Sequence, residues 1–455
     1  MNKDRILSET QSLCPECFAR IPAFRVASGD GVYLEKTCKE HGTYRTVIWR
    51  GKPAFGKWVR VKIPSTPKAC FTEAEKGCPF DCGLCTAHGQ HTCTALLEIT
   101  QRCNLRCPVC FASADAAPES DPDMATIRFW YDRVSEAGGT CNIQLSGGEP
   151  TVRDDLPAIV EMGRKAGFGF IQVNTNGLRL GTEKDFARKL ADAGLASVFL
   201  QFDGTDDAIH KKLRGRALMD IKRRAVENCI KAGIGVVLVP VLVPGVNTDN
   251  IGDILRFGLD YAPGVRGVHF QPVSYFGRYP QPPADRDRIT IPEVITALAD
   301  QTGDMIRPEH FRPPGCEHAL CSFHGNYMIL PDGQLKALTG NGGNSCCGPE
   351  KAEEGARQAI SSVARQWAAP LTPVCSCNSP EPASTPDDFD AFLARAKTHI
   401  FAISGMAFQD VWTIDLERLK GCCIHTVSPD GRLIPFCAYN VTNAHGEALY
   451  RGQCG

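Results

Sequence analysis

The chain has 455 residues, which is long enough for more than one domain with a substantial core. Its 50 Lys and Arg and 51 Asp and Glu give a formal net charge of -1, which argues against broad binding to nucleic acid or anionic membranes. The 23 cysteines, and an N-terminus without the apolar stretch of a signal peptide, favour metal ligation in a reducing cytosol over a disulfide framework. The long apolar run from 233 to 246 contains two prolines and is too short to cross a bilayer. We therefore expect a cytoplasmic protein without a transmembrane segment.

Residues 1–64 are predicted to form a small metal module of the rubredoxin or zinc-ribbon kind. Cys14 and Cys17 make a C-x2-C knuckle, and Cys38 faces them across an expected hairpin near 32–36. Two such corners can hold one tetrahedral ion, either zinc or iron. The fourth ligand is His41 or a cysteine such as Cys70. The alternative is a set of ordinary free thiols.

Residues 65–94 form a second cysteine-rich stretch. Cys78, Cys82 and Cys85 have the spacing C-x3-C-x2-C, which can present three thiolates to one iron–sulfur cube. We predict an auxiliary [4Fe–4S] cluster here, with its fourth ligand from elsewhere in the chain. A zinc site is the alternative, and Cys70 and Cys93 are left unassigned.

From 95 to 275 the pattern alternates between apolar strands and amphipathic helices, which indicates an α/β fold with a parallel sheet. The predicted strands are 96–100, 142–145, 170–174, 197–202, 236–243 and 268–271. The predicted helices are 127–137, 156–165, 183–193 and 221–232. Six such units fit a partial (β/α)6 TIM-like barrel, in which functional groups gather at the C-terminal ends of the strands.

The first of these strands runs directly into Cys103, Cys107 and Cys110, again spaced C-x3-C-x2-C. A [4Fe–4S] cube normally takes four thiolates, so three leave one iron open. The second strand ends in Ser146-Gly147-Gly148-Glu149-Pro150. Together these motifs resemble the radical S-adenosylmethionine (radical SAM) superfamily, and a structural zinc or disulfide loop is the alternative. The resemblance implies that SAM binds the open iron and is split by one electron into a 5′-deoxyadenosyl radical.

Other polar residues follow the strands that lie beyond the cysteine loop. By resemblance, Ser146, Gly147, Gly148 and Glu149 bind SAM, with Glu149 facing its amino group. Asn176 and Asp203 end the third and fourth strands, where the superfamily also contacts SAM, although Asn-Gly and Asp-Gly are common turn dipeptides as well. His269 and Gln271 alternate with apolar neighbours, so this pair can point inward, as a core histidine or as a substrate contact.

Residues 276–455 contain two copies of a strand, a Pro-Asp-Gly turn and a second strand, which predicts two β-hairpins. The second copy has Cys423 and Cys437 at its ends and resembles the cluster-binding hairpins of SPASM and twitch extensions. The first copy lacks a closing cysteine, and Cys316 and Cys321 are predicted to supply the missing ligands of a C-terminal auxiliary cluster. Between the two hairpins, four cysteines sit in Gly- and Pro-rich loops to which we assign no metal: Cys346, Cys347, Cys375 and Cys377.

The order of these motifs resembles the tetraether lipid synthase group of radical SAM proteins, to which pterin methyltransferase-like proteins are also related. The resemblance implies one or two auxiliary [4Fe–4S] clusters, one mononuclear iron or zinc, and an electron donor such as flavodoxin or ferredoxin. It favours C–C coupling of unactivated alkyl chains of lipids, which would place the protein at the membrane periphery. The alternatives are radical SAM methylation, pterin modification or peptide modification of a small substrate, and a non-catalytic metal-binding interaction protein.

Overall fold

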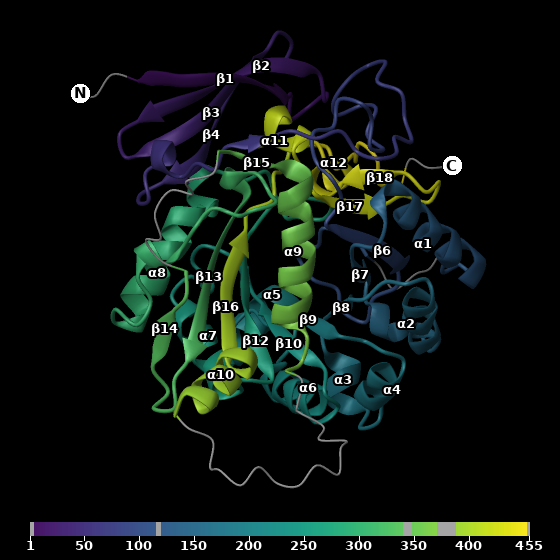
Figure 1. The fold of residues 1–455 in the computed structure, drawn as a ribbon. Coiled ribbons are helices and arrows are strands. Elements are labelled where there is room, and N and C mark those ends of the chain that lie inside the picture. The colour runs from purple at the N-terminus through teal and green to yellow at the C-terminus, as the bar shows by residue number, and fades with distance from the viewer. Residues whose placement is uncertain (1–3, 115–119, 340–347, 371–387, 453–455) are drawn as a thin grey trace, which may run out of the picture.

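A computed structural model describes residues 4–114, 120–339, 348–370 and 388–452 (Figure 1). Cys346, Cys347, Cys375 and Cys377 lie outside these ranges. Within them, no helix is long and apolar enough to span a membrane.

The N-terminal module is a four-stranded antiparallel sheet with its strands in chain order. The strands are β1 (Arg5–Leu13), β2 (Arg20–Ser28), β3 (Gly31–Cys38) and β4 (Gly42–Arg50). One face of the sheet packs on the C-terminal region, where the buried ammonium of Lys36 donates to Ser12 Oγ at 3.0 Å and to the Val411 carbonyl at 2.7 Å. An ion pair between Arg25 and Asp415 joins the same two regions. The module is therefore docked on the rest of the chain.

The predicted barrel strands are confirmed and form neighbouring parallel pairs in one sheet. They are β6 (Thr94–Thr100), β7 (Asn142–Gly147), β8 (Ile171–Thr175), β9 (Ser197–Gln201), β10 (Gly235–Val239) and β12 (Val265–Pro272), with the short β11 (Val241–Leu242) beside β12. Their side chains are almost entirely buried, as expected for strands covered on both faces.

Helices cover the outer face of this sheet, as Figure 1 shows. They are α1 (Met124–Gly138), α2 (Leu156–Lys165), α3 (Leu178–Thr182), α4 (Phe186–Asp192), α5 (Asp207–Arg214), α6 (Met219–Lys231) and α7 (Ile251–Asp260). The predicted helices at 127–137, 156–165 and 221–232 are confirmed. The predicted helix at 183–193 is shorter, as α4, and α3, α5 and α7 were not predicted.

The C-terminal region extends the barrel sheet at both edges. At one edge β16 (Ile400–Met406) pairs parallel with β12, followed by β13 (Ser322–Ile329) and β14 (Leu335–Ala337). At the other edge β17 (Ile424–Val427) pairs parallel with β6, followed by β18 (Leu433–Pro435). Both predicted hairpins are therefore present, and their strands belong to the same sheet as the barrel.

Helix α9 (Ala352–Trp367) lies across the front of the sheet in Figure 1, between the strands of its two edges. Its C-terminal end rests on β10, where a Cβ atom on Gly235 would lie 2.1 Å from the Trp367 carbonyl oxygen. The buried Arg266 guanidinium holds this end by donating to the Gln366 carbonyl at 3.0 Å and the Thr398 carbonyl at 2.7 Å. The other described elements are β5 (Lys62–Ile63), β15 (Glu350–Lys351), α8 (Ile291–Thr302), α10 (Asp388–Thr398), α11 (Leu416–Lys420) and α12 (Phe436–Asn440).

We predict that Gly235→Ala lowers stability by about 1–3 kcal/mol, because the added methyl group overlaps backbone that has little freedom to move. Gly138→Ala is the matched control, since a Cβ atom there meets nothing within 4 Å. Melting temperatures of the two variants test this. Equal melting temperatures would show that α9 does not press on β10.

Candidate active site and metal centres

The cysteine loop that follows β6 is fastened to the end of β7 by backbone contacts. The Gly148 amide donates to the Thr100 carbonyl, and the Glu149 amide donates to the Arg102 carbonyl, both at 2.8 Å. A Cβ atom on Gly147 would lie 2.1 Å from the Thr100 carbonyl oxygen, and one on Gly148 would lie 2.2 Å from that of Arg102. The two glycines are therefore needed for the loop to sit on β7, in addition to any approach to a ligand.

Cys103, Cys107 and Cys110 lie in this loop as free thiols. They pack in one apolar cluster with Leu105, Leu178 and Leu218. Burial raises the pKa of Cys103 to about 11, so the free thiol is neutral near pH 7, and a bound metal would displace its proton. Three sulfur donors on one loop in an apolar setting fit an iron–sulfur cluster with one open iron.

Arg278, just beyond the predicted end of the barrel, holds the loop from its other side. Cys110 and Arg278 exchange backbone hydrogen bonds of 2.9 and 3.0 Å. The Arg278 side chain donates from Nε to the Cys107 carbonyl at 3.0 Å and from Nη1 to the Ala114 carbonyl at 3.2 Å. Arg278 was not predicted as a site residue, because an arginine after a strand has no distinguishing sequence pattern.

The carboxylate of Glu149 is buried at the edge of a cavity beneath the loop. Its Oε1 accepts from the Thr151 amide at 3.1 Å, from Thr151 Oγ1 at 2.6 Å and from Thr175 Oγ1 at 2.7 Å. Its Oε2 accepts from the Asn176 amide at 2.6 Å. Since Oε2 has a second lone pair, Glu149 can accept one more hydrogen bond, as the predicted contact with the amino group of SAM requires.

Asn176 and Asp203, both predicted to contact SAM, occupy different positions. Asn176 lines the cavity and donates from Nδ2 to Asn104 Oδ1 at 2.7 Å, which ties the end of β8 to the cysteine loop. Asp203 is fully buried and accepts two hydrogen bonds of 2.7 Å from Arg214. Of this pair, Arg214 lines the cavity. The predicted direct contact of Asp203 is thus corrected to a positioning role through Arg214, which lies on the unpredicted helix α5.

The cavity has a volume of about 300 Å³ and runs from the cysteine loop into the barrel. Ser146 to Glu149 line it beside the cysteine loop, and α9 contributes Ala359, Val363 and Trp367 to its wall. The volume is in the range of sites for small molecules, roughly 300–1,000 Å³. The lining also includes His269 and a group of amides: Asn142, Gln144, Asn174, Gln201 and Gln271.

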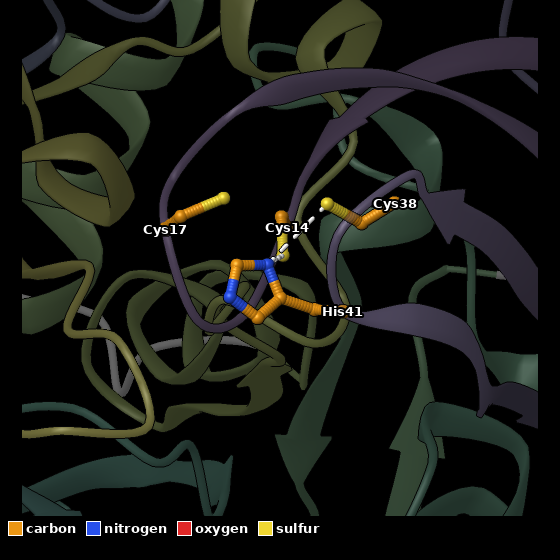
Figure 2. Close-up of side chains that lie close together, drawn as sticks. All are labelled: Cys14, Cys17, Cys38 and His41. Atoms are coloured by element: carbon orange, nitrogen blue, oxygen red, sulfur yellow. Dashed lines mark hydrogen bonds between the residues drawn. The ribbon is translucent and has the colours of Figure 1, made fainter.

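The N-terminal metal site contains the three predicted cysteines, and His41 lies with them as the fourth residue. Figure 2 shows Cys14, Cys17, Cys38 and His41 pointing toward one another, and their ligand atoms all lie within 4.8 Å. His41 Nδ1 is 3.7 Å from Cys14 Sγ and 3.5 Å from Cys38 Sγ. The hydrogen bond from His41 lowers the pKa of Cys38 to about 6. This donor set fits one tetrahedral ion with His41, and not Cys70, as the fourth ligand.

Cys70 lies instead beside the predicted auxiliary-cluster loop of Cys78, Cys82 and Cys85. The Phe71 amide donates to the Gly83 carbonyl at 3.2 Å, which aligns residues 70–72 with this loop. Burial and then the neighbouring Cys85 raise the pKa of Cys70. Cys70 is therefore the candidate for the missing fourth ligand.

The hairpin of β17 and β18 forms as predicted, but its cysteines join different groups. Cys423 lies with Cys93 and Cys316, and their sulfur atoms are all within 4.8 Å. Cys437 lines a second cavity of about 30 Å³ with Cys321 and Cys422, to whose wall Cys423 also contributes. The four cysteines predicted as candidate ligands of a C-terminal cluster, Cys316, Cys321, Cys423 and Cys437, therefore fall into two groups. Cys423 thus lies between the two groups, while its neighbour Cys422 lines only the second cavity among those described.

The second cavity adjoins the large one. Five residues line both cavities: Glu317, Met406, Phe408, Ile424 and Phe436. Arg418 Nη2 donates to Cys321 Sγ at 3.2 Å, and the Gln409 amide donates to Cys437 Sγ at 3.3 Å. Donors to sulfur are a usual means of tuning iron–sulfur clusters, so this group fits an auxiliary cluster next to the large cavity.

Comparison with known proteins places the chain in a family. Residues 97–258 match the profile of the Radical SAM superfamily, and residues 6–50 match that of the HMPTM N-terminal zinc ribbon domain. A 7,8-dihydro-6-hydroxymethylpterin dimethyltransferase of Methanocaldococcus jannaschii is 34% identical over 471 residues, covering 95% of this chain and 93% of that protein. The chain belongs to this radical SAM family. A probable GTP 3′,8-cyclase of Methanothermobacter thermautotrophicus is 29% identical over 37% of this radical SAM chain and 55% of the cyclase.

Similar solved structures include proteins with bound AdoMet or a bound peptide. anSMEcpe with AdoMet and the Cp18Cys peptide shows 20% identity and a TM-score of 0.37 over 46% of this chain and 58% of that one. SuiB of Streptococcus suis with its precursor peptide SuiA shows 14% identity and a TM-score of 0.36 over 40% of each chain. Each likeness covers less than half of this radical SAM enzyme.

We predict that replacing Cys103, Cys107 and Cys110 together with Ala abolishes formation of 5′-deoxyadenosine from SAM, because these three thiols lie on the loop whose backbone packs on the Gly-Gly-Glu segment. The auxiliary sites should keep their metal. Cys229→Ala, which removes a buried thiol outside these groups, is the control. SAM cleavage by the reconstituted triple variant under dithionite would refute the assignment.

The regrouped cysteines make a second prediction. Cys422→Ala should lose the same metal as Cys437→Ala, and Cys93→Ala the same metal as Cys423→Ala, so that the two losses add when variants are combined across groups. Iron and zinc per chain, with Mössbauer spectra, measure this. One shared loss for Cys423→Ala and Cys437→Ala, not increased in the double variant, would restore the single-cluster prediction.

Proposed function

We propose that this radical SAM enzyme modifies a compact nitrogen heterocycle of the pterin kind, by methylation at carbon, in the cavity beneath its cysteine loop. The observation that carries the proposal is the lining of this cavity, where amide and aromatic side chains accompany the predicted SAM-binding residues. Such groups suit a flat molecule with hydrogen-bonding atoms around its ring. The dimethyltransferase relative, which is aligned over 95% of the chain, supports the same substrate class.

Each end of the cavity has a separate task in this proposal. Cys103, Cys107 and Cys110 hold the cluster, which supplies the electron that splits bound SAM, and flavodoxin or ferredoxin delivers that electron. Glu149 binds the amino group of SAM, and Asn176 and Arg214 border the same end. The helix α9 excludes water from the side of the cavity, which protects a carbon radical from solvent.

Coupling of lipid alkyl chains is the second candidate. The apolar part of the lining, which includes Val109, Phe111, Val243, Phe276 and Phe436, favours it. A hydrocarbon cannot form hydrogen bonds with the amide side chains of the cavity, and for this reason we prefer the heterocycle as substrate.

We expect the reconstituted enzyme, with SAM and dithionite, to convert 7,8-dihydro-6-hydroxymethylpterin into products heavier by one or two methyl groups, with formation of 5′-deoxyadenosine. Cell extract supplies the methyl source in the first assay. Mass spectrometry of pterins and of lipids from the same reaction compares the candidates. Unchanged pterin beside newly joined lipid chains would overturn the proposal in favour of lipid coupling.

A further inference from the structure

A continuous chain of side-chain hydrogen bonds crosses the interior of the barrel below the SAM-binding end. Asn174 Nδ2 donates to Gln144 Oε1 at 3.4 Å, Gln144 Nε2 donates to Gln172 Oε1 at 3.0 Å, and Gln172 Nε2 donates to Ser197 Oγ at 2.9 Å. These residues come from three neighbouring strands, β7, β8 and β9. Each amide in the chain is therefore fixed by its neighbours before any ligand binds.

Two carbonyl oxygens in this region have no partner. Asn174 Oδ1 and Gln201 Oε1 are both shielded from solvent and accept no hydrogen bond within the described residues. Both side chains line the cavity. A buried acceptor without a donor costs about 1–3 kcal/mol, so two of them in one cavity indicate that a bound molecule supplies the donors.

Aromatic side chains stand next to these acceptors. Phe199 and Asn174 are register partners on β9 and β8, which sets the ring and the amide at the same height. The ring centroid of Phe199 lies 4.8 Å from that of Trp367 on α9 and 5.5 Å from that of His269 on β12. All three rings line the cavity. They give a flat ligand an apolar face to pack on.

His269 adds no charge to this wall. Its Nδ1 is 2.9 Å from Ser404 Oγ, and burial lowers its pKa to about 4. The imidazole is therefore neutral near pH 7. A neutral wall suits an uncharged ring better than a phosphate or a carboxylate.

The positions of Asn174 along β8 and of Gln201 along β9 show how far the two acceptor oxygens lie from the SAM end of the cavity. Along β8, Asn174 lies two residues before Asn176, and Gln201 lies two residues beyond Phe199 on β9. Two residues of a strand span about 6.6 Å. Because Asn174 and Phe199 are register partners, Gln201 lies at the height of Asn176, so the two acceptors face the cavity from its interior and from its SAM end.

We propose that Asn174 and Gln201 accept hydrogen bonds from ring N–H and amino groups of a flat two-ring heterocycle, whose face packs on Trp367 and Phe199. The proposal rests on the proposed function, since the heterocycle is its substrate, and it assigns the residues that select it. In a pterin, the N3–H and the 2-amino group supply the donors.

The test is equilibrium binding, independent of turnover. The probes are 6-hydroxymethylpterin, followed by its fluorescence, and quinoxaline, which has a similar two-ring shape but no N–H donor. Asn174→Leu and Gln201→Leu should each weaken pterin binding about tenfold and leave quinoxaline binding unchanged or tighter. Trp367→Ala should weaken both probes, and Trp367→Phe should restore most of the affinity. Affinity for SAM should be the same in all variants, which also reports that they are folded.

Asn228→Leu is the matched control, because this amide lies on α6, where its Nδ2 donates to the Leu180 carbonyl at 2.8 Å, outside the cavity. Unchanged pterin affinity in both Asn174→Leu and Gln201→Leu overturns the subsite, and the proposed function survives if the wild type still modifies the pterin. Equal affinity of the wild type for quinoxaline and pterin also overturns the role of the two acceptors. Failure of the wild type to bind the pterin overturns both the subsite and the proposed function.

Discussion

The close backbone contact between the ends of β6 and β7 is the constraint on which the rest of the site depends. Thr100 and Gly147 are register partners in the parallel pair, and the chain leaves each of them directly into a functional loop. Because Gly147 and Gly148 have no Cβ atom, the carbonyl groups of Thr100 and Arg102 can pack directly against their α-carbons. The cluster ligands and Glu149 are thereby fixed relative to each other before SAM binds. Preorganisation of this kind places the ordering cost in folding and not in ligand binding.

Buried charges at the neighbouring strand ends reinforce this arrangement. The ammonium of Lys222 donates to the Asn176 carbonyl at 2.6 Å and the Gln201 carbonyl at 2.5 Å, which joins the ends of β8 and β9. Asp203 and Arg214 form a buried pair beside them. Removing one partner of such a pair typically costs about 3–5 kcal/mol, because the other charge is left uncompensated. The polar rim of the cavity is therefore stable only as a complete network.

Features that depend on residues close together in the sequence could be predicted, and features that depend on contacts between distant segments could not. Apolar strands followed by short polar motifs identified β6 to β12, the cysteine loop and the Gly-Gly-Glu segment, because these depend on local pattern. The zinc-ribbon cysteines were also found, since two knuckles suffice for one ion. The helix α9 and the addition of β16 and β17 to the barrel sheet depend on pairing between distant segments, which no local pattern encodes. The grouping of Cys422 with Cys437, and of Cys423 with Cys93, could not be predicted from the sequence for the same reason. Asp203 was predicted at the correct strand end, but it pairs with Arg214, and it is Arg214 that lines the cavity.

The most direct measurement concerns the open iron and the segment that faces it. Electron–nuclear double resonance of the reduced enzyme, with SAM labelled by nitrogen-15 in its amino group, detects whether that nitrogen binds the cluster held by Cys103, Cys107 and Cys110. The account predicts a clear coupling from the labelled nitrogen in the wild type and in Cys229→Ala, and its loss in Glu149→Ala at SAM concentrations that saturate the wild type. Saturating SAM without nitrogen coupling in the wild type would contradict it.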